Sequence, residues 1–185
     1  MSAPASRRGR RIALTLAVPA LLLVSACGSD DAATPENAEV AADETVNDLL
    51  QQDPTLSAMA GLVDATGMAE VLGAAPNYTL LAPNDTALAT LQGSDQRDAA
   101  AEAALLRGHL LPGYLTLEDI TAAIEASDTG SVTMQTMAQT PVTFSKEGGA
   151  IKVSSADGAS ALIVGQGLRG GNGVVLPVDG VLKTL

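Results

Sequence analysis

The fold of this chain is decided by one stretch in its middle, which reads Tyr78-Thr79-Leu80-Leu81-Ala82-Pro83-Asn84-Asp85-Thr86-Ala87-Leu88. Its first five residues are apolar or β-prone and Pro83 follows them, so the pattern predicts a short buried strand. Asn84 is a favourable N-cap residue, and the carboxylate of Asp85 suits the positive end of a helix dipole. The stretch therefore predicts a strand that runs straight into a helix.

The segments on either side of this stretch differ in character. Before it, apolar residues recur at helical spacing and predict three short helices, with apolar positions at Val46, Leu49, Leu50, Leu56, Met59, Leu62, Val63, Met68, Val71 and Leu72. After it, one helix is predicted over 99–111, ended by Pro112, and another over 117–124, capped by Thr116. From Ser131 onward, strand-length apolar runs alternate with turns. Helices first and antiparallel hairpins second predict an α+β fold.

Two further stretches of the sequence are as distinctive as the first. The second reads Leu105-Leu106-Arg107-Gly108-His109-Leu110-Leu111-Pro112-Gly113-Tyr114-Leu115-Thr116, and the third reads Asn172-Gly173-Val174-Val175-Leu176-Pro177-Val178-Asp179-Gly180-Val181-Leu182. In this order, the three stretches resemble the signatures of fasciclin-type (FAS1) domains. The resemblance implies a β-wedge of antiparallel strands with an N-terminal helical layer over residues 44–185. It also implies an extracellular or surface-tethered module linked to adhesion and matrix contacts.

The resemblance marks five residues of these signatures as structural, namely Asn84, Asp85, His109, Asn172 and Gly173. His109 is the sole histidine of the chain and shares a helix face with Leu105 and Leu106. In the family this histidine is hydrogen-bonded inside the domain, so a buried structural side chain is expected here. A catalytic or ligand-binding histidine is the alternative.

The chain departs from the family pattern at several positions. Gly108 stands where the family has a tyrosine that is associated with adhesive contacts, which argues against integrin-like recognition. Leu88 stands where phenylalanine is usual, and Leu176 and Pro177 replace histidine and valine. Because proline cannot donate a ladder hydrogen bond, the last strand is expected to be an edge strand or to carry a bulge at Pro177.

The N-terminal residues predict export and lipid attachment. Four arginines within residues 7–11 precede an apolar run over 12–24, as in a secretory signal. The following Ser25-Ala26-Cys27 resembles the lipobox of bacterial lipoproteins, in which the cysteine becomes the lipidated first residue. Residues 1–26 are therefore predicted to be a lipoprotein signal peptide, and Cys27 the lipidation site. The alternative is an ordinary signal peptide that contains a cysteine. We expect the chain in the cell envelope, lipid-anchored to a membrane and facing the periplasm or the cell surface.

The negative charge of the chain argues against binding to nucleic acid or directly to anionic lipid surfaces. Residues 27–43 are acidic and poor in large apolar residues, which is typical of a flexible tether. The chain has 21 acidic and 10 basic residues, a net charge of -11, and loss of four arginines with the signal peptide would make it -15. Such a surface repels phosphate backbones and anionic headgroups. Nucleic acid is therefore not expected as a partner, and the membrane would be reached through the lipid anchor.

Residue types that support catalysis are sparse. With one histidine and with Cys27 as the only cysteine, no zinc site and no cofactor are expected. Residues 165–170 spell G-x-G-x-x-G, but β-branched residues follow instead of the helix that a dinucleotide site requires. We expect this segment to be a flexible loop between strands. The chain is accordingly predicted not to be an enzyme.

The predicted function is that of a membrane-anchored extracytoplasmic binding module that mediates adhesion to a surface protein or matrix component. A carrier of a small apolar ligand, such as a carotenoid, is the alternative. The candidate contact residues are Tyr114 and Arg169, because exposed tyrosine and arginine are over-represented at the centres of interfaces. Alternatively, Tyr114 packs inward and Arg169 only solubilises a turn.

Overall fold

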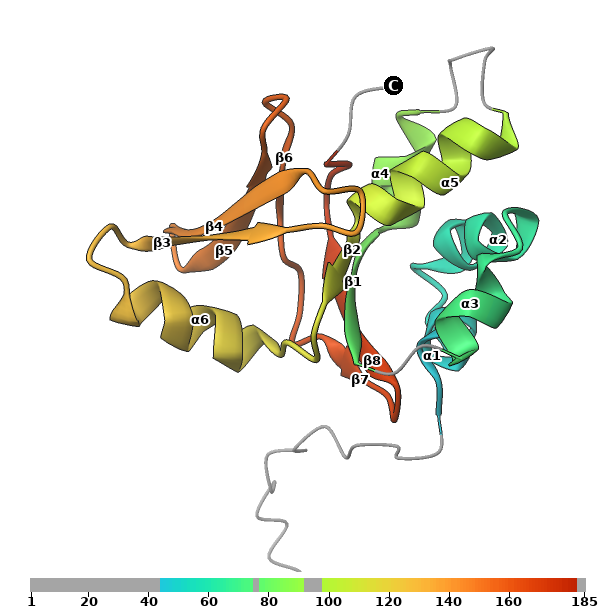
Figure 1. Cartoon of the computed structure of the whole chain (residues 1–185), viewed down its shortest axis with the longest axis horizontal. Helices are drawn as coiled ribbons and strands as arrows, with labels where there is room; N and C mark the ends of the chain where they lie inside the picture. The colour runs from blue at the N-terminus through green and yellow to red at the C-terminus, as the bar shows by residue number, and fades with distance from the viewer. Residues whose placement is uncertain (1–43, 75–76, 92–97, 183–185) are drawn as a thin grey trace, which may run out of the picture. The chain divides into compact units, whose positions relative to one another are not determined.

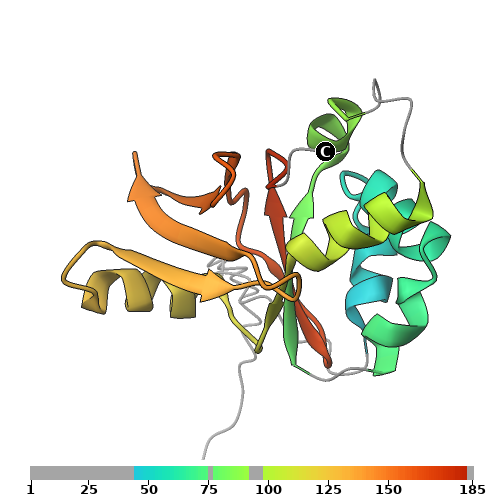
Figure 2. The ribbon, with the colours of Figure 1, turned by 45° about the horizontal axis from the view of Figure 1, so that its top comes forward.

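The computed structural model describes residues 44–74, 77–91 and 98–182, which form three layers (Figures 1 and 2). The predicted signal peptide, Cys27 and the acidic tether lie outside the described residues. Helices cover one face of a central sheet, and a second sheet with a helix of its own lies on the other face. The predicted α+β class, with helices preceding hairpins, is confirmed.

The helical layer is formed by short helices with local caps. It contains α1 (Val46–Gln52), α2 (Ser57–Ala65), α3 (Met68–Ala74), α4 (Asp85–Ala89) and α5 (Ala99–Gly108). Thr45 and Asp48 form a capping box at the start of α1, and Asp98 accepts a hydrogen bond from the backbone N–H of Ala101 in α5. Each such cap is worth about 1 kcal/mol, so these helices begin where their sequences specify.

The central sheet has the strand order β2-β1-β8-β7. Its strands are β1 (Tyr78–Pro83), β2 (Leu110–Pro112), β7 (Leu168–Arg169) and β8 (Gly173–Val178). β1 and β8 are parallel, with Tyr78 opposite Gly173, whereas β2 and β7 pair antiparallel with their neighbours. The parallel pair is an exception among strands that were predicted to be antiparallel. It is possible because most of the domain, rather than a tight hairpin, connects β1 to β8.

The second sheet is a run of antiparallel hairpins. Its strands follow one another as β3 (Ser131–Gln135), β4 (Pro141–Glu147), β5 (Ala150–Ser155) and β6 (Ser160–Leu162). Gly148 and Gly149 adopt positive φ in the turn between β4 and β5, as a tight two-residue hairpin loop requires. Helix α6 (Leu117–Ala126) packs against β3 and β4 and buries Ile120 and Ile124.

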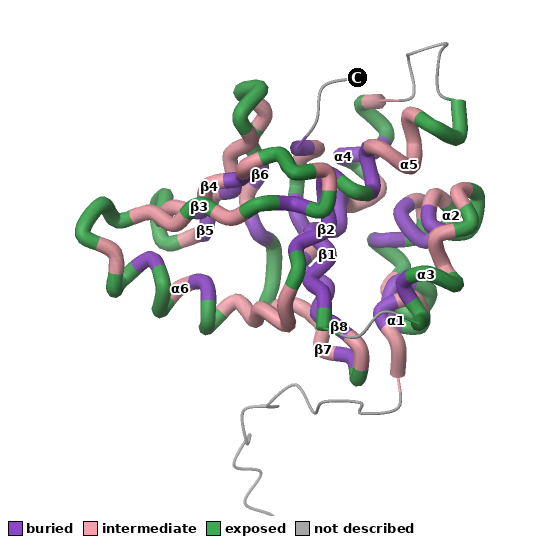
Figure 3. Tube along the Cα trace, in the orientation of Figure 1, coloured by how far each residue is buried: buried purple, intermediate pink, exposed green. Residues whose placement is uncertain are grey.

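Two apolar cores lie on opposite faces of the central β1–β8 pair. Every residue of β1 is buried (Figure 3). Tyr78 and Leu80 belong to the core under the helices, whereas Leu81 belongs to the core between the sheets, together with Phe144. Burial on both faces explains why the decisive stretch reads as a continuous apolar run instead of an alternating one.

Helix α5 ends earlier than predicted, at Gly108 rather than at Leu111. Leu110 and Leu111 belong to β2, opposite Leu80 and Thr79 of β1. Leu110 joins the helical core and Leu111 joins the core between the sheets. Adjacent residues reach opposite faces in a strand but not in a helix, so burial of both leucines requires the extended conformation.

The last strand was expected to be an edge strand or to carry a bulge at Pro177. Instead, β8 lies between β1 and β7 and keeps an uninterrupted register with β1 from Gly173 to Val178. Strand β7 pairs only with Val174 and Val175, so Pro177 lies beyond its end. The Pro177 carbonyl accepts a 2.8 Å hydrogen bond from the N–H of Val164. The N–H that proline lacks would therefore also point away from β1, so the ladder between β8 and β1 loses no bond. Strand β7 itself lies in the glycine-rich segment that was predicted to be a loop.

Candidate binding surface

His109 is buried at the end of α5 and uses both of its ring nitrogens. Its Nδ1 lies 2.8 Å from the carbonyl oxygen of Leu105, and the backbone N–H of Leu182 donates to Nε2 over 3.0 Å. Because a backbone N–H can only donate, Nε2 is the acceptor and the proton resides on Nδ1. Burial lowers the pKa of His109 to about 4, against an opposing contribution from the Leu105 carbonyl. The ring is therefore neutral at pH 7 and does not reach solvent.

Asn172 and Gly173 fasten the start of β8 to the helical layer. The Asn172 side chain accepts a hydrogen bond from the N–H of Val46 and donates one to the carbonyl of Leu72, each over 2.9 Å. A Cβ at Gly173 would lie 2.5 Å from the Tyr78 carbonyl oxygen. Only glycine fits at this close approach between β8 and β1.

Asn84 and Asp85 fasten the other end of β1. The Asn84 side chain accepts a 2.8 Å hydrogen bond from the N–H of Ala87 and so caps α4. Asp85 instead reaches α2, where it accepts hydrogen bonds from the Ser57 hydroxyl at 2.6 Å and the Ala58 N–H at 2.8 Å. The two residues therefore organise the starts of two helices.

The two candidate contact residues, Tyr114 and Arg169, are both partly buried. Arg169 lies in β7, and its Nη2 is 2.5 Å from Oε2 of Glu118 in the first turn of α6. The Arg169 side chain is only 27% exposed, against 66% for Glu118. Tyr114 is partly buried and packs against the core between the sheets. Arg169 therefore connects α6 to the central sheet through this ion pair.

Glu118 lies in the first turn of α6, where an acidic side chain suits the helix dipole, and its pairing with Arg169 was not predicted. Hydrogen bonds from its own backbone N–H and from Thr116 lower the pKa of Glu118, and Arg169 contributes less. A second pair joins Glu125 to Lys146 of β4, with Nζ 2.5 Å from Oε1. No sequence signal could have paired residues so far apart in the chain.

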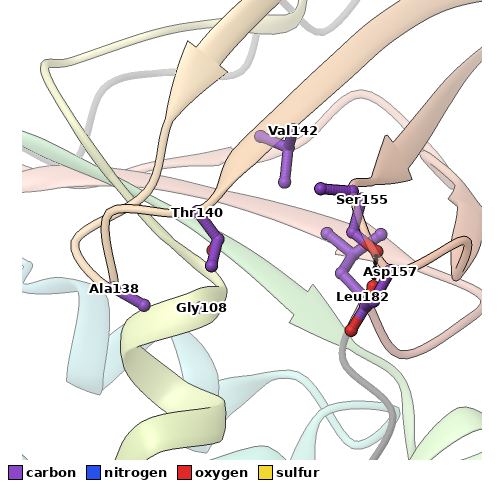
Figure 4. A pocket seen from close by; sticks show the side chains of 8 residues that line it. Gly108, Ala138, Thr140, Val142, Ser155, Asp157 and Leu182 are labelled. Atoms are coloured by element: carbon purple, nitrogen blue, oxygen red, sulfur yellow. Dashed lines mark hydrogen bonds between the residues drawn. The ribbon is translucent and has the colours of Figure 1, made fainter.

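A small apolar cleft opens beside Gly108 (Figure 4). It lies between the end of α5, the β3–β4 turn and the β5–β6 turn. Its lining residues are Gly108, Ala138, Thr140, Val142, Ser155, Ala156, Asp157 and Leu182. Gly108 contributes no side chain to fill the space. The cleft holds about 130 Å³, close to the roughly 150 Å³ of a cavity that binds benzene. It can take one small apolar group.

A wider and more open hollow of about 340 Å³ lies on the outer face of α6. It is lined by Leu117, Glu118, Thr121, Ala122, Glu125 and Gln166. The carboxylates of Glu118 and Glu125 are both ion-paired and largely exposed. This surface is thus too open to enclose an apolar ligand.

Within the described ranges, no group of histidine, cysteine and acidic side chains could hold a metal ion. The helices of these ranges are all too short or too polar to cross a membrane.

The family model for the fasciclin domain matches residues 54–184. This range includes all three signature stretches, and the chain belongs to the fasciclin domain family. The residues that the resemblance marked as structural lie at junctions between the layers of this fold.

A solved structure of similar fold is that of a FAS1 domain pair from the insect cell adhesion molecule fasciclin I. The two share 20% sequence identity with a TM-score of 0.58, over 69% of this chain and 45% of that chain. The chain thus spans less than half the length of that structure, and the likeness establishes the fold alone. No curated protein matches the chain at a significant level.

Proposed function

We propose that the chain is a non-catalytic binding module, held at the cell envelope by a lipid anchor, that mediates adhesion to a surface protein or matrix component. Membership of an adhesion-related family supports this proposal. The main observation in support of a non-catalytic role is that His109, the sole histidine of the chain, is neutral, buried and hydrogen-bonded through both ring nitrogens. Function then depends on the outer surface of the domain.

The carrier alternative requires an enclosed apolar space. The cleft beside Gly108 holds about 130 Å³, whereas pockets for drug-sized ligands enclose roughly 300–1,000 Å³. The chain also has only one phenylalanine and two tyrosines to line such a site. A long polyene does not fit the cleft, and these observations favour the adhesive module.

We test adhesion in the cells that naturally carry the chain. A deletion strain should attach to the surface or matrix less than the parent strain, and the full chain should restore attachment. Tyr114→Ala and Arg169→Ala test the proposed contact residues. Lys146→Ala is the matched control, because it also breaks an ion pair to α6 but lies on the second sheet. Equal attachment with and without the chain contradicts the proposal.

Absorption spectra and native mass measurements on freshly purified chain separate the two candidate functions. The adhesive module should show the mass of the polypeptide with its lipid and no visible absorption. A stoichiometric chromophore or added small-molecule mass would favour the carrier.

The anchor is tested at Cys27, which lies outside the described residues. Cys27→Ala should move the protein from the membrane fraction to the soluble envelope fraction, because acyl chains contribute ~0.8 kcal/mol per buried methylene to membrane binding. A variant that stays as firmly in the membrane fraction as the wild type would show that the chain is held in another way.

A further inference from the structure

Strand β3 forms an open edge of the second sheet. It has 5 residues, against 3 each for β2 and β6 and 2 for β7, the other edge strands that the structure describes. Two of these edges are occupied in part. Leu110 of β2 accepts a hydrogen bond from the Met137 N–H, and the segment after β6 bridges to β8.

The hydrogen-bond pattern shows which backbone groups of β3 face outward. The Thr136 N–H donates to the Thr140 carbonyl, and the register continues with Met134 opposite Val142. Partners in an antiparallel pair alternate, so the even-numbered residues of β3 bond to β4 and the odd-numbered residues point away. Pro141 fits this assignment, because it lies opposite Gln135, where no bond to β3 is made.

Part of the outward side is already bonded within the domain, and the Met137 N–H, just past the end of β3, donates to the Leu110 carbonyl. The Ser131 carbonyl accepts a 2.8 Å hydrogen bond from the Ser127 hydroxyl. The N–H and C=O groups of Thr133 and Gln135 have no partner among the described residues, and both residues are exposed. Four strong hydrogen-bonding groups therefore face solvent in one row.

Strand β3 lacks the usual devices that protect such an edge. Its sequence, Ser131-Val132-Thr133-Met134-Gln135, contains no lysine and no proline. Natural edges are commonly blunted by charge, proline or a bulge, because a row of free N–H and C=O groups pairs readily with another chain. An uncovered edge of this kind supports recognition by strand addition.

Charge identifies the kind of segment that fits this edge. The described residues include 15 acidic side chains and only 4 basic ones, and three of those basic residues, Lys146, Lys152 and Arg169, are already ion-paired. Helix α6, which packs beside β3, has three acidic residues and no basic one. A second copy of the chain would bring the same negative charge and be repelled.

We infer that the edge of β3 binds an extended segment of a partner protein that carries basic side chains and adds to the sheet as a further strand. The inference rests on the proposed function as a binding module and specifies where the partner binds and its chemistry. Main-chain hydrogen bonds to Thr133 and Gln135 hold the segment, and its basic side chains lie in the negative field of the domain.

The probe is a fluorescein-labelled nonapeptide that alternates lysine with threonine, measured by anisotropy against the full chain in non-ionic detergent. Two control peptides separate pairing from charge. One carries backbone N-methyl groups on alternate residues, and the other has glutamate in place of lysine. The lysine peptide should bind, and each control should bind at least tenfold more weakly.

The decisive variants are at Thr133. Thr133→Pro removes an outward N–H that makes no bond within the domain, so it should fold with a near-normal melting temperature. Thr133→Val keeps this N–H. Both variants lose the hydroxyl contact to Thr143, which makes them a matched pair. Thr133→Pro should weaken peptide binding at least tenfold, whereas Thr133→Val should stay within about twofold. Gln135→Pro removes the next outward N–H and should repeat the loss even if Thr133→Pro folds poorly.

Several results would overturn the inference: no binding of the lysine peptide, equal binding of the N-methylated peptide, or wild-type affinity in both proline variants. A concentration-dependent dimer that the proline variants abolish would show that a second copy occupies the edge instead. Attachment of cells distinguishes the two proposals. If Thr133→Pro cells attach as well as wild type while deletion cells do not, the β3 inference fails and the adhesive function stands.

Discussion

At the scale of the residue, His109 joins two distant parts of the chain through one imidazole ring. We expect His109→Ala to lower the free energy of unfolding by about 2–4 kcal/mol, because the Leu182 N–H loses its buried acceptor and a cavity forms. Urea unfolding measures this change. A normal stability combined with lost binding would instead make His109 a contact residue.

The same ring makes the stability of the domain depend on pH. The pKa of His109 is about 4 in the folded chain, below its ordinary value of 6.5, so the unfolded state takes up a proton first as the pH falls. The contribution is fully present above about pH 6.5 and is lost as the pH falls toward 4. Between pH 7 and 5 the free energy of unfolding should fall by about 2 kcal/mol.

Because the chain has no other histidine, His109→Gln is a clean control for this pH dependence. The variant should be less stable at pH 7, but the part of the slope between pH 7 and 5 that His109 causes should disappear. An unchanged slope would mean that another group titrates there.

How far single residues could be predicted depended on the range of their contacts. Asn84 caps the helix that begins next to it, and its sequence position alone indicates that role. Asp85 also follows the strand, but it caps α2, whose Ser57 lies 28 residues earlier. The pair of Arg169 and Glu118 joins residues 51 positions apart. Such partners depend on the assembled layers, so local pattern could not reveal them.

At the scale of the element, the parallel contact between β1 and β8 depends on Gly173. We expect Gly173→Ala to destabilise the domain by about 2 kcal/mol or more, because the added Cβ would lie 2.5 Å from the Tyr78 carbonyl oxygen and 2.9 Å from Val46. Thermal unfolding measures the loss.

Gly61, within α2, provides the matched control. It is exposed, and an added Cβ would meet nothing within 4 Å. Gly61→Ala should therefore stabilise the domain by about 0.5–1 kcal/mol through helix propensity. If Gly173→Ala were equally harmless, the close packing of β8 on β1 would be incorrect.

Elements with local signals were predictable, and elements that depend on packing were not. Helix α6 follows its capping residue Thr116, and the β4–β5 hairpin follows Gly148 and Gly149. Residues 110–112 follow a helix, and Leu110 and Leu111 were predicted to be part of it. They form β2 because Leu110 and Leu111 must enter different cores. Strand β7 is too short to carry a period of its own.

For the whole molecule, the resemblance of the three signature stretches predicted the α+β fold with its N-terminal helical layer. Each stretch contributes to the central sheet or to the helix end beside it. The candidate contact surface could be predicted less well. Tyr114 and Arg169 were chosen by residue type, yet exposure is set by the neighbouring layers, which partly bury both side chains. The free edge of β3 was not foreseen, because its openness follows from the strand order of the second sheet.

We propose above that this domain acts through contacts made by its outer surface. The most direct test uses the lipid-free domain, residues 44–185, which contains both apolar cores, as a soluble competitor of cell attachment. The domain should bind envelope or matrix components and block attachment in a saturable way. A folded domain that neither binds these components nor reduces attachment at high micromolar concentration would contradict it.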